Sequence, residues 1–109
     1  MKIEDFITLP EVRQQCYLDQ ADVSEDPFLT LLISASLATI ENKTNRKLYE
    51  LGDPAIPEEG LEFTDDIKIA ALLLIGHWYE NREDSADVAV KNIPMGFNAL
   101  ISPYVYIPV

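Results

Sequence analysis

The segment IKIAALLLIGHWYENRE, from Ile67 to Glu83, decides the fold class of this 109-residue chain. Its apolar residues recur at helical spacing and cover nearly all sides of a helix, a pattern typical of a helix enclosed by other elements. Thr64 is a suitable N-cap, and Asp65 and Asp66 place negative charge in the first turn, where the helix dipole favours it. The pattern predicts a central helix, buried in the fold or at a contact between subunits.

Gly76 lies inside this predicted helix. A glycine there costs about 1 kcal/mol relative to alanine. Close approach of another helix would justify that cost, and the alternative is a glycine that the helix merely tolerates. The polar segment from Glu80 to Asp87 ends the helix, and residues 84–92 are expected to form an exposed, flexible loop.

A second helix is predicted before the central one, from about Pro27 to Lys43. Ser24 or Asp26 can cap it, and Asn45 tolerates the left-handed backbone that commonly ends a helix. Its apolar stripe consists of Leu29, Leu32, Ile33, Leu37 and Ile40.

Residues 1–22 are interpreted as an N-terminal helix with Thr8 as N-cap and Pro10 in the first turn. Residues 50–63, rich in proline, glycine and acidic residues, are expected to form a flexible loop or a short hairpin between the second and third helices.

In the C-terminal part, regular structure is predicted to begin again at Ile93. Residues 95–101 are long enough for two helical turns, and Pro103 should end that helix. Residues 103–109 alternate aromatic and β-branched side chains, which indicates a tail that docks on its own domain or on a partner. We therefore predict one all-α domain over residues 1–109, a small bundle of three to four helices.

The charge of the chain limits its partners. It has 19 acidic and 8 basic residues, a net charge of −11. Such a surface repels phosphate, which disfavours binding to nucleic acid or to an anionic membrane. The simplest interpretation is solubility, and the more specific one is a surface that lies near DNA without adhering to it.

Catalytic chemistry has few candidate residues here. Cys16 is the only cysteine and His77 the only histidine, so a disulfide within the chain and a zinc cluster are excluded. Both side chains are best interpreted as structural, and the four glycines are too scattered for a phosphate-binding loop. We expect a non-enzymatic protein with no cofactor and no metal.

Three segments together carry a family likeness: IENKTNRKLY (Ile40–Tyr49), IKIAALLLIGHWYENRE and IPMGFNALISPY (Ile93–Tyr104). In this order and spacing the chain resembles the head–tail connector proteins of long-tailed bacteriophages, also described as head-completion adaptor or DNA-packaging proteins. Two positions depart from the family pattern: Asn45 stands where glycine is common, and Val105 where arginine often follows the Pro-Tyr pair.

The resemblance implies an assembly role in the virion, at the head–tail junction, after assembly in the host cytoplasm. It implies a ring of roughly a dozen copies that docks below the portal protein after DNA packaging. The ring would extend the DNA channel, through which DNA passes without specific binding, and would offer a platform to the next neck or tail-completion protein.

Three sets of contacts are expected within this assembly. The portal contacts are Pro94, Met95, Phe97, Leu100, Pro103, Tyr104 and Tyr106. The contacts between subunits are Arg46, Trp78, Tyr79 and Arg82. The loop that faces the lumen or the neck carries Asp84, Asp87 and Lys91. The alternative function is that of an acidic DNA mimic that inhibits a DNA-binding protein, which the net charge permits.

Overall fold

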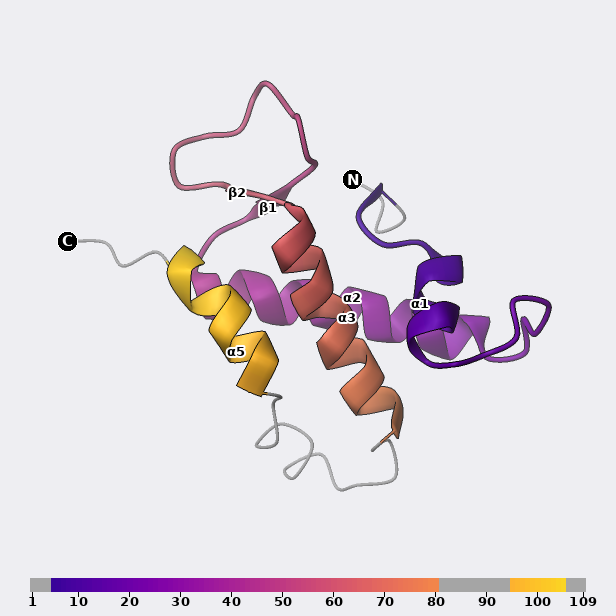
Figure 1. The fold of residues 1–109 in the computed structure, drawn as a ribbon. Helices are drawn as coiled ribbons and strands as arrows, with labels where there is room; N and C mark the ends of the chain where they lie inside the picture. Colours follow the sequence, from indigo (N-terminus) through magenta and orange to yellow (C-terminus); the bar gives the residue numbers. More distant parts are fainter. Residues whose placement is uncertain (1–4, 81–94, 106–109) are drawn as a thin grey trace.

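The computed structural model describes residues 5–80 and 95–105. The described part contains four α-helices, two short strands and one 3-10 turn (Figure 1). Their bounds are α1 Leu9–Gln15, α2 Asp26–Thr44, β1 Leu48–Tyr49, β2 Leu61–Glu62, α3 Asp65–Glu80, α5 Met95–Ile101 and η2 Ser102–Tyr104. The predicted mostly helical fold is confirmed, whereas the predicted loop at residues 84–92 lies outside the described residues.

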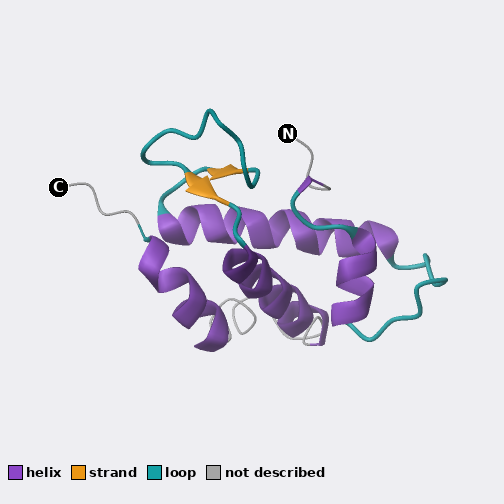
Figure 2. Cartoon of the chain, turned by 45° about the horizontal axis from the view of Figure 1, so that its top comes forward, coloured by secondary structure: helices purple, strands orange, loops and turns teal. Residues whose placement is uncertain are grey.

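The helix α3 is the centre of the fold, as its apolar pattern predicts. It packs against α1, α2 and α5 (Figures 1 and 2). Its fully buried side chains are Ile67, Ala70, Ala71, Leu74 and Ile75. A Cβ atom added at Gly76 would lie 3.3 Å from Nε2 of Gln15. The close approach that Gly76 suggested is therefore made by α1.

Thr64 occupies the cap position of α3, since its carbonyl oxygen accepts the bond from the Lys68 N–H at 3.0 Å. The side chain that caps the exposed amides is Asp66, whose Oδ1 accepts the Ile67 N–H at 3.0 Å. The Thr64 hydroxyl donates to the same carboxylate. Thr64 thus orients the capping group.

The first helix is much shorter than predicted, because α1 covers only Leu9–Gln15. Its start agrees with the sequence: Thr8 and Glu11 form a capping box, and the Thr8 N–H donates to Glu11 Oε1 at 2.9 Å. The helix ends at Cys16 because Tyr17 adopts a left-handed backbone with φ of +59°. That residue turns the chain away from the helix axis, so residues 16–22 cannot continue it.

The start of α2 also differs from the prediction. Neither Ser24 nor Asp26 caps it; Glu25 holds the N-cap position and makes no side-chain cap bond. The Ser24 hydroxyl donates to Asp22 at 2.6 Å, and the Asp26 carboxylate pairs with Arg13 of α1 at 2.7 Å. The side chains expected to cap the helix are thus engaged in other contacts.

The end of α2 agrees with the sequence, since Asn45 has the predicted left-handed backbone with φ of +56°. Of the two alternatives predicted between the second and third helices, the loop is found and the hairpin is not. The strands β1 and β2 run parallel, with Leu48 opposite Leu61 and Tyr49 opposite Glu62. Residues 50–60 carry the chain back to the beginning of β1, so that β2 runs in the same direction as β1. The side chains of Leu48 and Leu61 are both buried in the core.

The helix α5 has the predicted bounds. Pro103 lies two residues after its last residue, Ile101, and the chain continues there for one 3-10 turn. Among the described helices, none has the length and apolar character needed to cross a bilayer.

Candidate assembly interface

The C-terminal segment is held on the bundle by two apolar side chains. Phe97 is fully buried and Ile101 is 3% exposed, and both lie in the core on the side of α3. A Cβ atom at Gly96 would lie 3.3 Å from Cδ1 of Leu73, so α5 also approaches α3 closely. Burial of an aromatic ring of this size is a large stabilising contribution.

Polar bonds fix the turn that follows α5. Arg46, at the end of α2, donates from Nε to the Tyr104 carbonyl oxygen at 2.7 Å and from Nη1 to the Gly60 carbonyl oxygen at 3.2 Å. The Tyr104 hydroxyl donates to the Asp66 carboxylate at the start of α3. One arginine therefore joins α2, the loop before β2 and the C-terminal turn.

These contacts shift two ionisation equilibria. The Thr64 hydroxyl, together with that of Tyr104, lowers the pKa of Asp66 because both donate to its charged form. The Asp66 carboxylate raises the pKa of Tyr104, because ionised Tyr104 would lose this bond and face a like charge.

The predicted portal contacts occupy different environments. Pro103 is exposed, Leu100 and Tyr104 are half-buried, and Phe97 is completely enclosed by its own chain. Met95 begins α5, and Pro94 and Tyr106 lie outside the described residues. The burial of Phe97 supports a role in anchoring α5, and its portal contact stays a prediction.

The predicted subunit contacts lie in two places. Arg46 belongs to the polar cluster described above, whereas Trp78 and Tyr79 are half-buried near the end of α3. The Tyr79 hydroxyl donates to Glu25, and its ring lies 6.4 Å from that of Phe28. These contacts tie α3 to the start of α2. Arg82 lies outside the described residues, as do Asp84, Asp87 and Lys91 of the expected lumen-facing loop.

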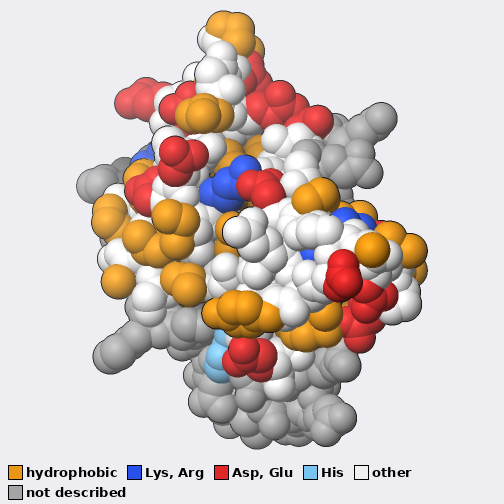
Figure 3. All heavy atoms as spheres, turned by 45° about the vertical axis from the view of Figure 1, so that its right-hand side comes forward, with side chains coloured by type: hydrophobic (Ala, Val, Ile, Leu, Met, Phe, Trp, Pro, Cys, Tyr) orange, Lys and Arg blue, Asp and Glu red, His pale blue; other side chains and the backbone are white. Residues whose placement is uncertain are grey.

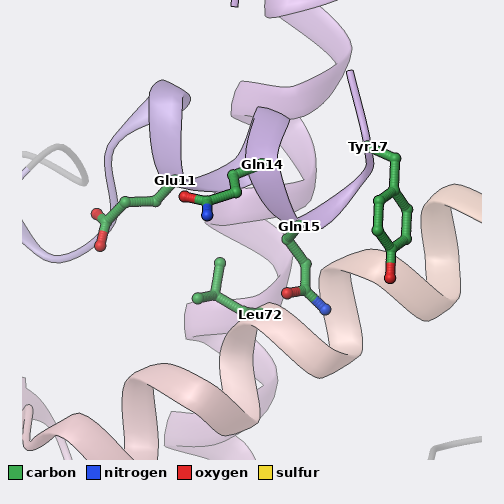
Figure 4. A pocket seen from close by; sticks show the side chains of 5 residues that line it. All are labelled: Glu11, Gln14, Gln15, Tyr17 and Leu72. Carbon is green, nitrogen blue, oxygen red and sulfur yellow. The ribbon is translucent and has the colours of Figure 1, made fainter. Parts of the chain in front are cut away.

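A surface pocket of about 450 Å³ opens between α1 and α3 (Figure 4). It is lined by Glu11, Gln14, Gln15, Tyr17 and Leu72. The carboxylate of Glu11 is paired with Lys68 at 2.6 Å. The pocket thus presents two amides, one aromatic ring, one aliphatic side chain and a carboxylate paired with a lysine.

Cys16 and His77, the two residues considered for catalysis, are both partly buried. Burial, together with Glu25 and Glu80, raises the pKa of the Cys16 thiol to about 11, so the nucleophilic thiolate is scarce at neutral pH. His77 is half-buried at the end of α3. Within the described residues, no group of three or more His, Cys, Asp or Glu side chains is arranged to hold a metal ion.

Acidic side chains gather on the loop that projects from β1 and β2 (Figure 3). They are Glu50, Asp53, Glu58, Glu59 and Glu62. A side-chain hydrogen bond with Asp5, together with the like charge of that carboxylate, raises the pKa of Glu50.

One exposed aromatic residue was missed by sequence reasoning. Tyr17 falls within the helix predicted over residues 1–22, yet its backbone is left-handed and its side chain is 91% exposed. No local signal marks this position, since Tyr is uncommon in that conformation.

The family likeness suggested by the three sequence segments is confirmed. The family model described as phage gp6-like head-tail connector protein matches residues 6–104, nearly the whole chain. No curated protein gives a significant match, and neither does any solved structure. The chain therefore belongs to the phage gp6-like head–tail connector family, and is a structural protein of the phage virion.

Proposed function

We propose that copies of this chain form a ring of roughly a dozen subunits that docks below the portal after DNA packaging. The ring extends the DNA channel and offers a platform to the next neck or tail-completion protein. The observation that carries this proposal is the family match over residues 6–104. The chain assembles in the host cytoplasm and remains at the head–tail junction of the virion.

The acidic surface suits a channel component. With a net charge of −11, the subunits repel the phosphate backbone, and DNA passes without being held by counterion release. The loop with Asp84, Asp87 and Lys91 is proposed to face this lumen or the next protein of the neck.

Portal contact is assigned to α5, the following turn and the tail. Pro103 and Leu100 supply accessible surface, whereas Phe97 holds the helix in place and Tyr104 positions the turn. Met95, Pro94 and Tyr106 are proposed as further portal contacts. Contacts between subunits are assigned to Arg46, Trp78, Tyr79 and Arg82.

The test is electron microscopy of negatively stained protein, alone and mixed with portal-bearing capsids that lack it. We expect rings at the portal vertex. A chain truncated after Val105 should keep its folded stability, because the Tyr104 contacts to Arg46 and Asp66 remain intact. It should fail to dock, because the tail proposed to contact the portal is missing. A truncation after Pro103 is a poorer test, since it also removes those contacts.

Normal docking of the chain truncated after Val105 would refute the assignment of the tail. A wild-type chain that stays monomeric at high concentration and ignores portal-bearing capsids would refute the ring itself. Inhibition of a DNA-binding enzyme by that monomer would instead favour the DNA-mimic function.

A further inference from the structure

A second surface hollow lies beside the C-terminal half of α2. It has a volume of about 280 Å³, and its apolar lining comes from Phe6, Leu37, Ala38 and Leu48. The polar residues that line it are Ser34, Glu41 and Lys47, and the Glu41 carboxylate accepts the Leu48 N–H at 2.9 Å. We call this hollow the α2 groove. Its lining makes it suitable for an aromatic or aliphatic side chain from a partner.

Two lysines give this end of α2 a positive charge. Lys43 and Lys47 are exposed, and in the described part of the chain neither forms an ion pair. Arg13 and Lys68, by contrast, are paired with carboxylates of their own chain. The α2 groove thus contains one lysine that forms no ion pair, Lys47, and one carboxylate, Glu41, that is bonded to the backbone; Lys43 adds a second exposed positive charge at the same end of α2.

The opposite end of α2 carries a complementary projection. Residues 17–24, which we call the Tyr17 loop, project beyond the start of α2 (Figure 1). Tyr17 has the most exposed of the large hydrophobic side chains described, and Val23 is 61% exposed. Asp19 and Asp22 of the same loop are exposed acids. An aromatic side chain with acidic neighbours matches an apolar groove with basic neighbours.

We propose that the Tyr17 loop of one copy docks in the α2 groove of the next copy. The proposal rests on the ring proposed above and names the surfaces that build it. The two surfaces differ and lie at opposite ends of α2, whose 19 residues span about 28 Å. A contact between two different surfaces is heterologous, and such contacts repeat head to tail until a ring closes.

Electrostatic repulsion between copies favours a contact at the α2 groove. Copies with a net charge of −11 repel one another over most of their surface. This repulsion is weakest where Lys43 and Lys47, the lysines of the described residues that form no ion pair, lie close to Asp19 and Asp22 of the next copy. The α2 groove is the place that offers this.

The first test is Tyr17→Gly, with self-association measured by sedimentation and by ring counts on portal-bearing capsids. Loss of this aromatic anchor should weaken self-association by more than about tenfold. The unfolding midpoint should stay equal or rise, because glycine adopts the left-handed backbone of residue 17 without strain. Leu51→Ala is the matched control, since Leu51 is 63% exposed on a different loop.

The second test exchanges charges across the contact. Lys47→Glu and Asp19→Lys should each weaken ring formation, and the double variant should restore it, because each copy then carries both reversed partners. Added salt should weaken self-association in wild type and in Tyr17→Gly, whose opposite charges are intact, and should not weaken it in the single charge variants, where like charges meet.

The outcomes separate this contact from the ring itself. If wild type forms rings and Tyr17→Gly forms them as well as Leu51→Ala does, this contact is refuted and the ring stands. If Tyr17→Gly forms rings but fails to join capsids, the loop binds the portal and the contact is likewise refuted. If wild type forms no ring in either setting, both proposals fall.

Discussion

The two ends of α2 are attached to the rest of the chain by different chemistry. At its start, the carboxylate of Asp26 pairs with Arg13, which is only 7% exposed. At its end, Arg46 donates to the backbone carbonyl oxygens of Tyr104 and Gly60, which are neutral. An ion pair depends on the identity of both residues, whereas a bond to a carbonyl oxygen survives any side-chain change at the acceptor. The start of α2 is therefore sensitive to substitution of either Asp26 or Arg13. Its end is sensitive chiefly to substitution of Arg46, and of Phe97, which anchors α5.

The largest effect is expected from Phe97→Ala, which removes the anchor of α5. Loss of a fully buried Phe side chain should lower the free energy of unfolding by about 3–5 kcal/mol. Urea unfolding of the purified chain measures this, and Leu100→Ala at a half-buried position is the control. A loss for Phe97→Ala no greater than that of the control would show that α5 is held mainly by its polar contacts.

A smaller loss is expected from Asp26→Asn at the other end of α2. The substitution leaves the Arg13 guanidinium largely buried beside a neutral amide, and should cost about 2 kcal/mol because Asp26 is partly exposed. Asp19→Asn in the preceding loop should change stability little. Equal stability of the two variants would contradict the view that the start of α2 depends on charge pairing.

Tyr104→Phe removes one hydrogen bond and should cost about 1 kcal/mol at neutral pH. The Asp66 carboxylate keeps the Thr64 hydroxyl and the Ile67 N–H as donors, and the bond from Arg46 to the residue 104 carbonyl is untouched. Urea unfolding at neutral pH measures the loss. If Tyr104→Phe lowers the free energy of unfolding as much as Asp26→Asn does, the end of α2 is as sensitive to side-chain substitution as its start, which would contradict the comparison above.

The same variant should alter the pH dependence of stability at both extremes. The lowered pKa of Asp66 means that its contribution is complete above the ordinary Asp range and is lost as pH falls through its folded value. The raised pKa of Tyr104 means that its contribution is complete below about pH 10 and is lost as pH rises through its folded value. The free energy of unfolding of Tyr104→Phe, measured from acid to alkaline pH, should fall less steeply at acid pH than that of wild type. At alkaline pH it should lack the decrease that ionisation of Tyr104 causes in wild type.

The smallest effect is expected from Gly76→Ala, where two terms oppose each other. Alanine is favoured over glycine in a helix by about 1 kcal/mol, but its Cβ would lie 3.3 Å from the Gln15 amide nitrogen. Gln15 is half-buried at the end of α1 and has to shift slightly. The net change in the midpoint of thermal unfolding should be close to zero, and Gly76→Val should be clearly destabilised.

Local signals predicted the parts of the fold that local chemistry controls. The end of α2 at Asn45, the cap at Thr8 and the bounds of α5 each depend on the preference of one or two residues for a backbone conformation. The enclosed position of α3 follows from its apolar pattern. These elements agree with the structure because tertiary packing reinforces the local preference.

The errors arose where distant contacts decide the conformation. The left-handed backbone of Tyr17 has no signal in its own residue type, and the helix assigned to residues 1–22 was therefore too long. The parallel pairing of Leu48 with Leu61 depends on burial of both side chains, which turn composition does not reveal.

The candidate contacts were only partly accessible to sequence reasoning. The bond from Arg46 to the Tyr104 carbonyl oxygen joins residues 58 positions apart. A helix-end arginine alone indicates a dipole interaction, and nothing local indicates which carbonyl oxygens it reaches. The Tyr17 loop and the α2 groove likewise emerge only when the helices are packed.

The parallel pairing of β1 and β2 has a consequence for engineering. Backbone bonds of 2.9 Å from Leu61 to Lys47 and from Phe63 to Tyr49 close the base of the excursion formed by residues 50–60. Lengthening a closed excursion adds little closure entropy, about 0.6 kcal/mol for each doubling. An epitope or fluorophore-binding peptide grafted at Gly52, where the open side has no neighbouring atoms within 4 Å, would report on single particles while α2 and α3 keep their places.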